Sequence, residues 1–156
     1  MEIRFKVNDQ LIRAPKDERC TLTEYLRDEL KLKGTRFGCG QEQCGACMVL
    51  VDGEPRCSCQ TEVGNLDGRA VHTVESLALE PEGRVLLENF ELHQAGQCGF
   101  CLSGILVQAL HFVRHSADGS AQAVASALEP HLCRCGAHAR IIAAVQASWR
   151  SLRGNP

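Results

Sequence analysis

Apolar positions alternate with charged ones at the start of the chain and change to a helical spacing after about residue 80. Ile3, Phe5 and Val7 alternate with charged residues, which predicts a strand with one buried face. Further strands are expected in the same half, at 11–14, 48–51, 56–61 and 71–74. The first half of the chain is therefore predicted to be rich in β-structure.

One helix is predicted within this β-rich half. Residues 21–24 read Thr-Leu-Thr-Glu, a capping box in which Thr21 is the N-cap and Glu24 bonds back to it. Apolar side chains from Tyr25 onward then line one face, and the helix is expected to end near Gly34. Cys20, just before the cap, is expected to pack against Tyr25 rather than to bind a metal.

Beyond a polar break at 80–83, the apolar residues recur with helical periodicity. Helices are expected at about 85–93, 102–115, 120–128 and 141–152. The segment 102–115 is apolar on so many sides that it should form the buried centre of a bundle. The predicted fold class is α+β, with a β-grasp, ferredoxin-like domain at 1–78 followed by an all-α four-helix domain at 79–156.

Composition narrows the functional classes. The 156 residues suffice for one ordinary domain or two small ones, and a net charge of -2 argues against nucleic-acid binding. No apolar run reaches the length of a membrane span. The alternating N-terminus does not resemble a signal peptide, and ten cysteines without an export signal indicate a reducing compartment. A cytoplasmic location is expected, with any membrane association mediated by a partner.

The first candidate site is a set of cysteines at C-x4-C-x2-C spacing with a fourth further along, namely Cys39, Cys44, Cys47 and Cys59. This is the plant-type spacing for a [2Fe–2S] cluster. Two irons need two thiolates each, so a tight loop must wrap the cluster while one ligand arrives from a neighbouring strand. Glycines among these cysteines let the backbone point its N–H groups at sulfur. A zinc-stabilised interaction module without redox activity is the alternative, although structural zinc sites more often use two C-x2–4-C pairs.

The helical half contains a second candidate site. Cys98 and Cys101 precede the expected buried helix, and Cys133 and Cys135 precede the last helix. Thiolates at helix N-termini are stabilised by unpaired N–H groups and by the positive end of the helix dipole. Two such helices side by side would present four thiolates to one metal centre. A second cluster is the preferred interpretation beside the first motif, with zinc as the alternative.

Three segments in this order resemble the iron–sulfur subunit of molybdenum hydroxylases, the xanthine oxidase family: 38–47, 97–101 and 132–136. The resemblance covers almost the whole chain. It implies two [2Fe–2S] clusters, one held by Cys39, Cys44, Cys47 and Cys59 and the other by Cys98, Cys101, Cys133 and Cys135. It also implies that Gln97 and Cys135 contact the molybdopterin cofactor of a separate large chain. Such a subunit relays electrons from that cofactor to an acceptor, a flavin (FAD) or a cytochrome c haem elsewhere in the complex.

Two local variants refine the resemblance. The segments 101–104 (Cys-Leu-Ser-Gly) and 135–138 (Cys-Gly-Ala-His) are more similar to the small subunits of nicotinate dehydrogenase and isoquinoline 1-oxidoreductase. This implies an N-heteroaromatic or aldehyde substrate for the complex. No nucleophile–base pair or nucleotide-binding fingerprint occurs, so no catalytic residue is expected in this chain. A free-standing two-cluster ferredoxin is a further alternative.

Two residues near the candidate ligands require separate expectations. Cys57 lies two residues from Cys59, so the two would share one face of a strand, and Cys57 is expected to be a buried thiol rather than a ligand. His138 follows a candidate ligand near the implied pterin contact. It is expected to be a partly exposed residue at the start of the last helix.

Overall fold

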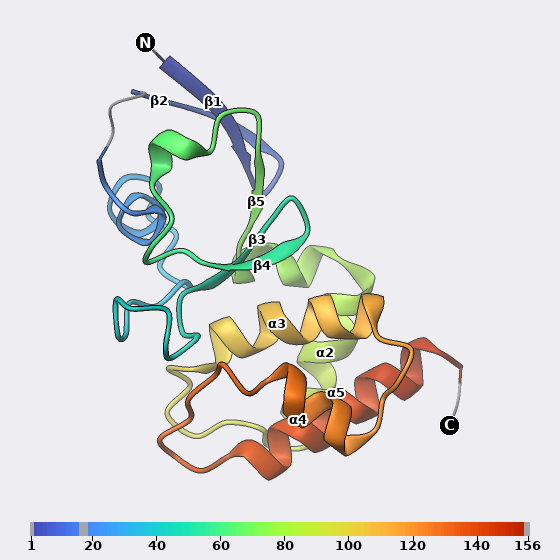
Figure 1. The fold of residues 1–156 in the computed structure, drawn as a ribbon. Helices are drawn as coiled ribbons and strands as arrows, with labels where there is room; N and C mark the ends of the chain where they lie inside the picture. Colours follow the sequence, from blue (N-terminus) through green and yellow to red (C-terminus); the bar gives the residue numbers. More distant parts are fainter. Residues whose placement is uncertain (1, 16–18, 155–156) are drawn as a thin grey trace.

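The computed structural model describes residues 2–15 and 19–154, which form a β-rich half and a helical half in contact with each other (Figure 1). The outer ends of the two predicted domains, Met1 and Pro156, lie outside the described residues. The division between 78 and 79 stays a prediction. None of the helices in the described ranges has the length and apolar character needed to cross a bilayer.

A five-stranded mixed sheet forms the N-terminal half. Its strands are β1 (Glu2–Val7), β2 (Gln10–Pro15), β3 (Met48–Val51), β4 (Glu54–Cys57) and β5 (Ala70–His72). They lie in the order β2-β1-β5-β3-β4, and only β1 and β5 run parallel. A 3-10 turn at Val63–Asn65 precedes β5. Around this sheet the chain has the mixed topology expected of a ferredoxin-like β-grasp domain.

The predicted strand at 56–61 is wrong in its second half. β4 ends at Cys57, and Cys59 lies in the turn that follows it. The buried Ser58 causes this, because both its backbone N–H and its hydroxyl donate to the Cys47 carbonyl, at 3.2 and 2.7 Å. The same hydroxyl lies 2.6 Å from that of Thr23. These bonds turn the chain away from the sheet, so Cys57 and Cys59 do not share a strand face.

The predicted helix after Thr21 is present but shorter than expected. It consists of α1 (Leu22–Glu24), which continues directly as a π-helix (Tyr25–Glu29). The capping box is confirmed, since the Thr21 N–H donates to the Glu24 carboxylate at 2.8 Å. The helix ends five residues before Gly34 because Lys31 adopts a left-handed backbone with φ of 60°.

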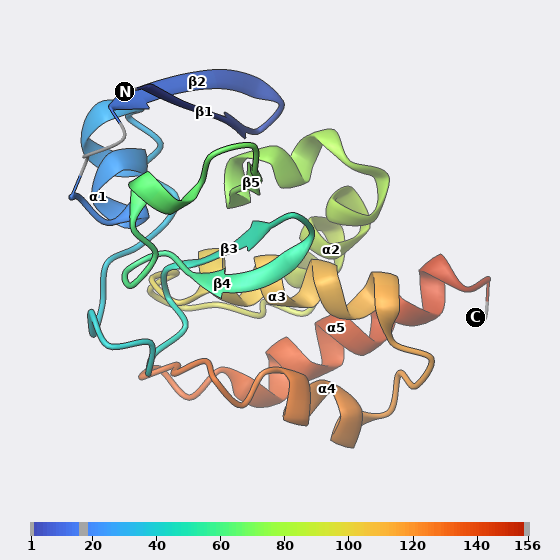
Figure 2. The ribbon, with the colours of Figure 1, turned by 45° about the horizontal axis from the view of Figure 1, so that its top comes forward.

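Four helices form the C-terminal half, after a 3-10 helix at Val74–Leu79. They are α2 (Pro81–Leu92), α3 (Leu102–His115), α4 (Ala121–Ala127) and α5 (His138–Leu152). The predicted polar break at 80–83 is instead the first turn of α2, with Pro81 at its first position, where a missing N–H costs nothing. In both views α3 lies between the sheet and the helices α4 and α5 (Figures 1 and 2).

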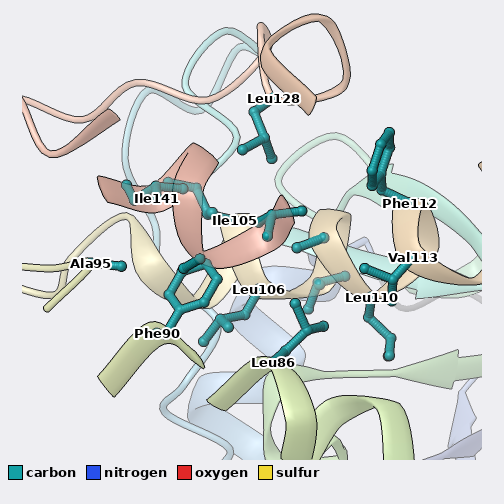
Figure 3. Packing of buried hydrophobic residues seen from close by; sticks show 14 of the residues in the cluster. Leu86, Phe90, Ala95, Ile105, Leu106, Leu110, Phe112, Val113, Leu128 and Ile141 are labelled. Carbon is teal, nitrogen blue, oxygen red and sulfur yellow. The ribbon is translucent and has the colours of Figure 1, made fainter. Parts of the chain in front are cut away.

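The hydrophobic core has two parts that meet at β3. In the helical core, Leu86 and Phe90 of α2 lie against Leu106 of α3 (Figure 3). Met48 and Leu50 of β3 also belong to this core, whereas the intervening Val49 belongs to the N-terminal core. Alternate residues of a strand point to opposite faces, so this single strand contributes to both cores. Burial of each such side chain stabilises the joined halves by about 1.5–3 kcal/mol.

Polar contacts reinforce this joint. The His111 ring on α3 donates from Nδ1 to the Gly53 carbonyl in the β3–β4 turn, at 3.1 Å. Within the helical half, Arg114 near the end of α3 pairs with Glu80 and Glu82 at the start of α2, which holds α3 in place under the sheet. The two halves are therefore fixed against each other by packing and by hydrogen bonds, which fixes the relative position of the two cysteine sets.

Candidate metal centres

The loop between the π-helix and β3 directs backbone N–H groups at sulfur. The N–H groups of Gln41 and Gln43 donate to Cys39 Sγ at 3.3 and 3.2 Å, and the Cys39 N–H donates to Cys44 Sγ at 3.4 Å. The bond from Gln41 is the main reason that the pKa of the Cys39 thiol falls to about 7. The loop thus stabilises thiolate before any metal is bound.

The four N-terminal thiols meet in two pairs. Cys39 contacts Cys44, and the buried Cys47 contacts the buried Cys59. The Cys57 thiol and burial both raise the pKa of Cys47, and burial raises that of Cys59 to about 11. Thiols with raised pKa values must lose protons to become metal ligands, so metal binding at this pair releases protons.

The helical half also brings its four thiols together in two pairs. Cys98 contacts Cys135, and Cys101, at the start of α3, contacts Cys133. Burial raises the pKa of Cys101 to about 12. The pKa of the exposed Cys98 is lowered, first by the Phe100 N–H and then by Cys135. The pKa of Cys133 is also lowered. Burial acts to raise it, but hydrogen bonds from backbone N–H groups and from the Cys101 thiol outweigh burial.

Pairwise contact is the arrangement that a two-iron cluster requires. All eight predicted ligands are free thiols, and each set of four comes from one half of the molecule. Across residues 2–15 and 19–154, no three His, Cys, Asp or Glu side chains converge on a position suited to one ion. In a [2Fe–2S] cluster with four cysteines, each iron takes two thiolates. Both sets therefore fit the cluster.

The two residues expected to contact a pterin lie together on the surface. The Gln97 side-chain amide donates from Nε2 to the Cys135 carbonyl at 3.1 Å, and Gln97 is exposed. The structure thus joins two positions 38 residues apart in sequence. Their contact with molybdopterin stays a prediction. His138 is the exposed first residue of α5, as expected.

The sequence did not predict that two further side chains lie against the N-terminal set. Cys57, expected to be a buried thiol, is half-buried and contacts Cys47, and only its position two residues from Cys59 hints at this contact. His131 is buried against Gly45, and burial lowers its pKa to about 4, which the Gly45 backbone opposes only in part. No periodicity or spacing in the sequence marks His131, because its contact partner lies in the other half. Cys20 is half-buried against the N-terminal core, in keeping with the expected packing role.

Two domain families match the chain in succession. Residues 5–78 match the 2Fe–2S iron–sulfur cluster binding domain, and residues 73–146 match the [2Fe–2S] binding domain. Each match contains one complete set of four candidate thiols. The chain therefore carries two cluster-binding domains.

Similar proteins extend over nearly the whole chain. The nicotine 6-hydroxylase small subunit of Paenarthrobacter nicotinovorans is 39% identical, over 93% of this chain and 87% of its own. The isoquinoline 1-oxidoreductase subunit alpha of Brevundimonas diminuta is 36% identical, over 92% and 94%. The structure of quinoline 2-oxidoreductase from Pseudomonas putida 86 has a chain that superposes with a TM-score of 0.87 at 32% identity, covering 100% of this chain and 98% of that one. The chain therefore belongs to the family of two-domain [2Fe–2S] iron–sulfur subunits of molybdenum hydroxylases, the xanthine oxidase family.

Proposed function

We propose that the eight paired thiols hold two clusters in line and that the chain relays electrons through them. One cluster would be held by Cys39, Cys44, Cys47 and Cys59, and the other by Cys98, Cys101, Cys133 and Cys135. The observation that carries this assignment is the pairing of thiols within each half. When bound, each cluster accepts and donates one electron at a time.

The residues of this chain set the environment of that transfer. In the N-terminal site, the N–H groups of Gln41 and Gln43 offset negative charge on Cys39 sulfur. Burial of Cys47, Cys59 and Cys101 keeps water from one side of each site. Cluster potentials depend on hydrogen bonds to sulfur and on solvent exposure. The two sites differ in both respects, so two distinct potentials are expected.

The helical site is proposed to face the large molybdopterin-binding subunit. Gln97 and Cys135 lie on its exposed side and would contact the pterin. Two large apolar side chains next to its ligands, Phe100 and Leu132, are 46% and 64% exposed. Exposed apolar residues around a functional site are typical of a docking surface. Electrons would then enter at the helical cluster and leave from the N-terminal one, to a flavin or a cytochrome c haem.

The substrate class and the location follow from relatives and from composition. Related subunits belong to complexes named for nicotine, isoquinoline and quinoline, so an N-heteroaromatic substrate is favoured, with aldehydes as the alternative. Specificity would reside in the large subunit, because no catalytic residue is assigned here. A cytoplasmic location is proposed, since ten cysteines that include two cluster motifs suit a reducing compartment.

Iron and sulfide analysis tests the cluster assignment. The purified complex should contain about four irons and about four sulfides in this chain, as two [2Fe–2S] clusters require. After reduction with dithionite, low-temperature electron paramagnetic resonance (EPR) should show two distinguishable signals. Colourless protein with zinc and no sulfide would contradict the assignment and favour a zinc-stabilised module.

A further inference from the structure

His131 is a buried imidazole between the two candidate centres. It lies between α4 and Cys133 and is 2% exposed, although the next residue, Leu132, is mostly exposed. Neither ring nitrogen makes a hydrogen bond within the described ranges. A buried polar group without a partner is uncommon and calls for an explanation. The Gly45 backbone is close enough to oppose part of the pKa lowering of the ring, but it makes no hydrogen bond of good geometry with either nitrogen, so the ring acts on its surroundings mainly through its shape.

The ring lies directly over Gly45 of the N-terminal loop. A Cβ at Gly45 would be 2.3 Å from His131 Nδ1 and 2.8 Å from two ring carbons. Gly45 also has φ of 69°, a left-handed conformation that glycine adopts without strain. A second element meets the same residue, because a Cβ at Gly104 in α3 would be 1.9 Å from the Gly45 carbonyl oxygen. Gly45 is therefore enclosed by two segments of the helical half.

Those two segments also carry the thiols of the helical site. Gly104 follows Cys101 by three residues, and His131 precedes Cys133 by two. Leu132, which lies between His131 and Cys133, donates its backbone N–H to the Cys44 carbonyl at 3.0 Å. A single hydrogen bond thus connects the backbone beside Cys133 to the backbone of Cys44. The loop of one centre is held by the segments of the other.

We propose that His131 is a positioning residue for electron transfer between the two clusters. Its ring fills the space over Gly45 and so fixes the Leu132–Cys44 hydrogen bond and the separation of the two centres. A smaller side chain would leave a cavity into which the loop or the 130–132 segment relaxes. The inference rests on the proposed cluster assignment, which iron content and the presence of two EPR signals test separately.

The test is the magnetic interaction between the two reduced clusters, which depends on their separation. The complete complex is prepared with His131→Ala, with His131→Leu, and with His115→Ala as a control at an exposed histidine of α3. Only preparations with full iron and both EPR signals are compared. His131→Ala should change the splitting of the signals, because relaxation into the cavity alters the separation of the clusters, whereas His131→Leu, which restores most of the ring volume, should retain it. His115→Ala should match the parent protein.

Two further variants keep the test decisive. If His131→Ala does not retain iron, His131→Val, which is also smaller than imidazole, replaces it in the comparison. Gly45→Ala should impair loading of the N-terminal cluster, and combining it with His131→Ala should recover part of that loss, because the collision at 2.3 Å is then removed. Splitting equal to that of the parent protein in a fully loaded His131→Ala or His131→Val complex would overturn the proposal. So would a double variant no better loaded than Gly45→Ala alone.

Discussion

The two thiol sites of this molecule are built from different elements and differ in exposure. The N-terminal site is formed by a loop with left-handed residues and N–H groups directed at sulfur, and its Cys47 and Cys59 are each 2% exposed. The helical site is formed by the segments that lead into α3 and α5, and its Cys98 is exposed. Much of the enclosure of the first site comes from the helical half, through His131 and Gly104.

This difference indicates how one small chain can connect two larger redox partners. The N-terminal centre is enclosed by its own chain on the side that faces the helical half, so its distance from the other centre is fixed by packing. The helical centre has an open side, which a partner must cover if water is to be excluded. Under the proposed function, the open side of the helical site is the docking end of the relay, and packing between the halves fixes the N-terminal site relative to it.

The largest expected effect is the loss of one cluster without the other. Cys44→Ser should remove the N-terminal signal and leave the helical one, and Cys133→Ser should do the reverse, because the thiol pairs do not mix between halves. EPR of the reduced complex with iron analysis measures both. Cys57→Ser is the matched control and should retain both signals. Loss of the N-terminal signal in Cys57→Ser would identify Cys57 as a ligand in place of Cys59.

The next expected effect distinguishes thiols within the N-terminal site. In the refolded metal-free chain at pH 7, about half of Cys39 should be thiolate, against roughly one in ten thousand for Cys59, given pKa values of about 7 and about 11. Iodoacetamide should therefore label Cys39 much faster than Cys59. Raising the pH to about 9 should narrow the difference, because Cys39 is then already ionised while the thiolate fraction of Cys59 still rises.

Mass spectrometry of peptides gives both alkylation rates. The same chain in urea serves as the control and should show similar rates at the two positions. Equal rates in the folded chain at pH 7 would show that the loop N–H groups do not stabilise the Cys39 thiolate.

A smaller effect is expected where α3 touches the N-terminal loop. Replacing glycine by alanine in a helix interior usually stabilises by about 1 kcal/mol. Gly104→Ala should instead destabilise by about 1–3 kcal/mol, because its Cβ would lie 1.9 Å from the Gly45 carbonyl oxygen. Urea denaturation measures the change, and the N-terminal EPR signal should shift.

Gly53→Ala provides the control for this variant. Gly53 has φ of 85°, so a side chain there would strain the backbone, but an added Cβ would meet no atom within 4 Å. It should lose stability through backbone strain and leave both EPR signals unchanged. A stabilised Gly104→Ala variant with an unchanged signal would show that α3 does not press on the loop.

The smallest effect is expected at the cap of α1. Thr21→Ala removes the cap of α1 and should cost about 1 kcal/mol in the free energy of unfolding. Thr21→Ser retains the hydroxyl and should stay close to the parent protein. Both variants should keep both EPR signals, which separates general stability from the environment of the clusters. A change in either signal would show that the helix contributes directly to a site.

Local sequence signals predicted the elements well and the joint between the halves poorly. The capping box at Thr21 and the apolar segment 102–115 each depend on neighbouring residues, and both are confirmed. The end of β4 was misplaced because Ser58 bonds to Cys47 and Thr23, which are distant in sequence. The helix was expected to end near Gly34 but ends earlier, at a left-handed Lys31. Lysine, unlike glycine, does not mark a left-handed position in a sequence.

The candidate sites show the same division. Both sets of four cysteines could be read from spacing, since metal ligands in loops and at helix starts follow short motifs. The enclosure of Gly45 by His131 and Gly104 could not be predicted from spacing, because each contact joins segments at least 59 residues apart. A contact of that kind leaves no periodic signal in one sequence.

Single-turnover reduction of the complex carrying Cys98→Ser tests the relay most directly. This substitution should disrupt the helical cluster and leave the N-terminal thiols intact, because Cys98 pairs with Cys135 in the helical half. Substrate should still reduce the molybdenum centre, while rapid-freeze EPR should find the N-terminal cluster oxidised on the timescale at which the parent complex reduces it. Prompt reduction of the N-terminal cluster in the Cys98→Ser complex would contradict the proposed order of electron transfer.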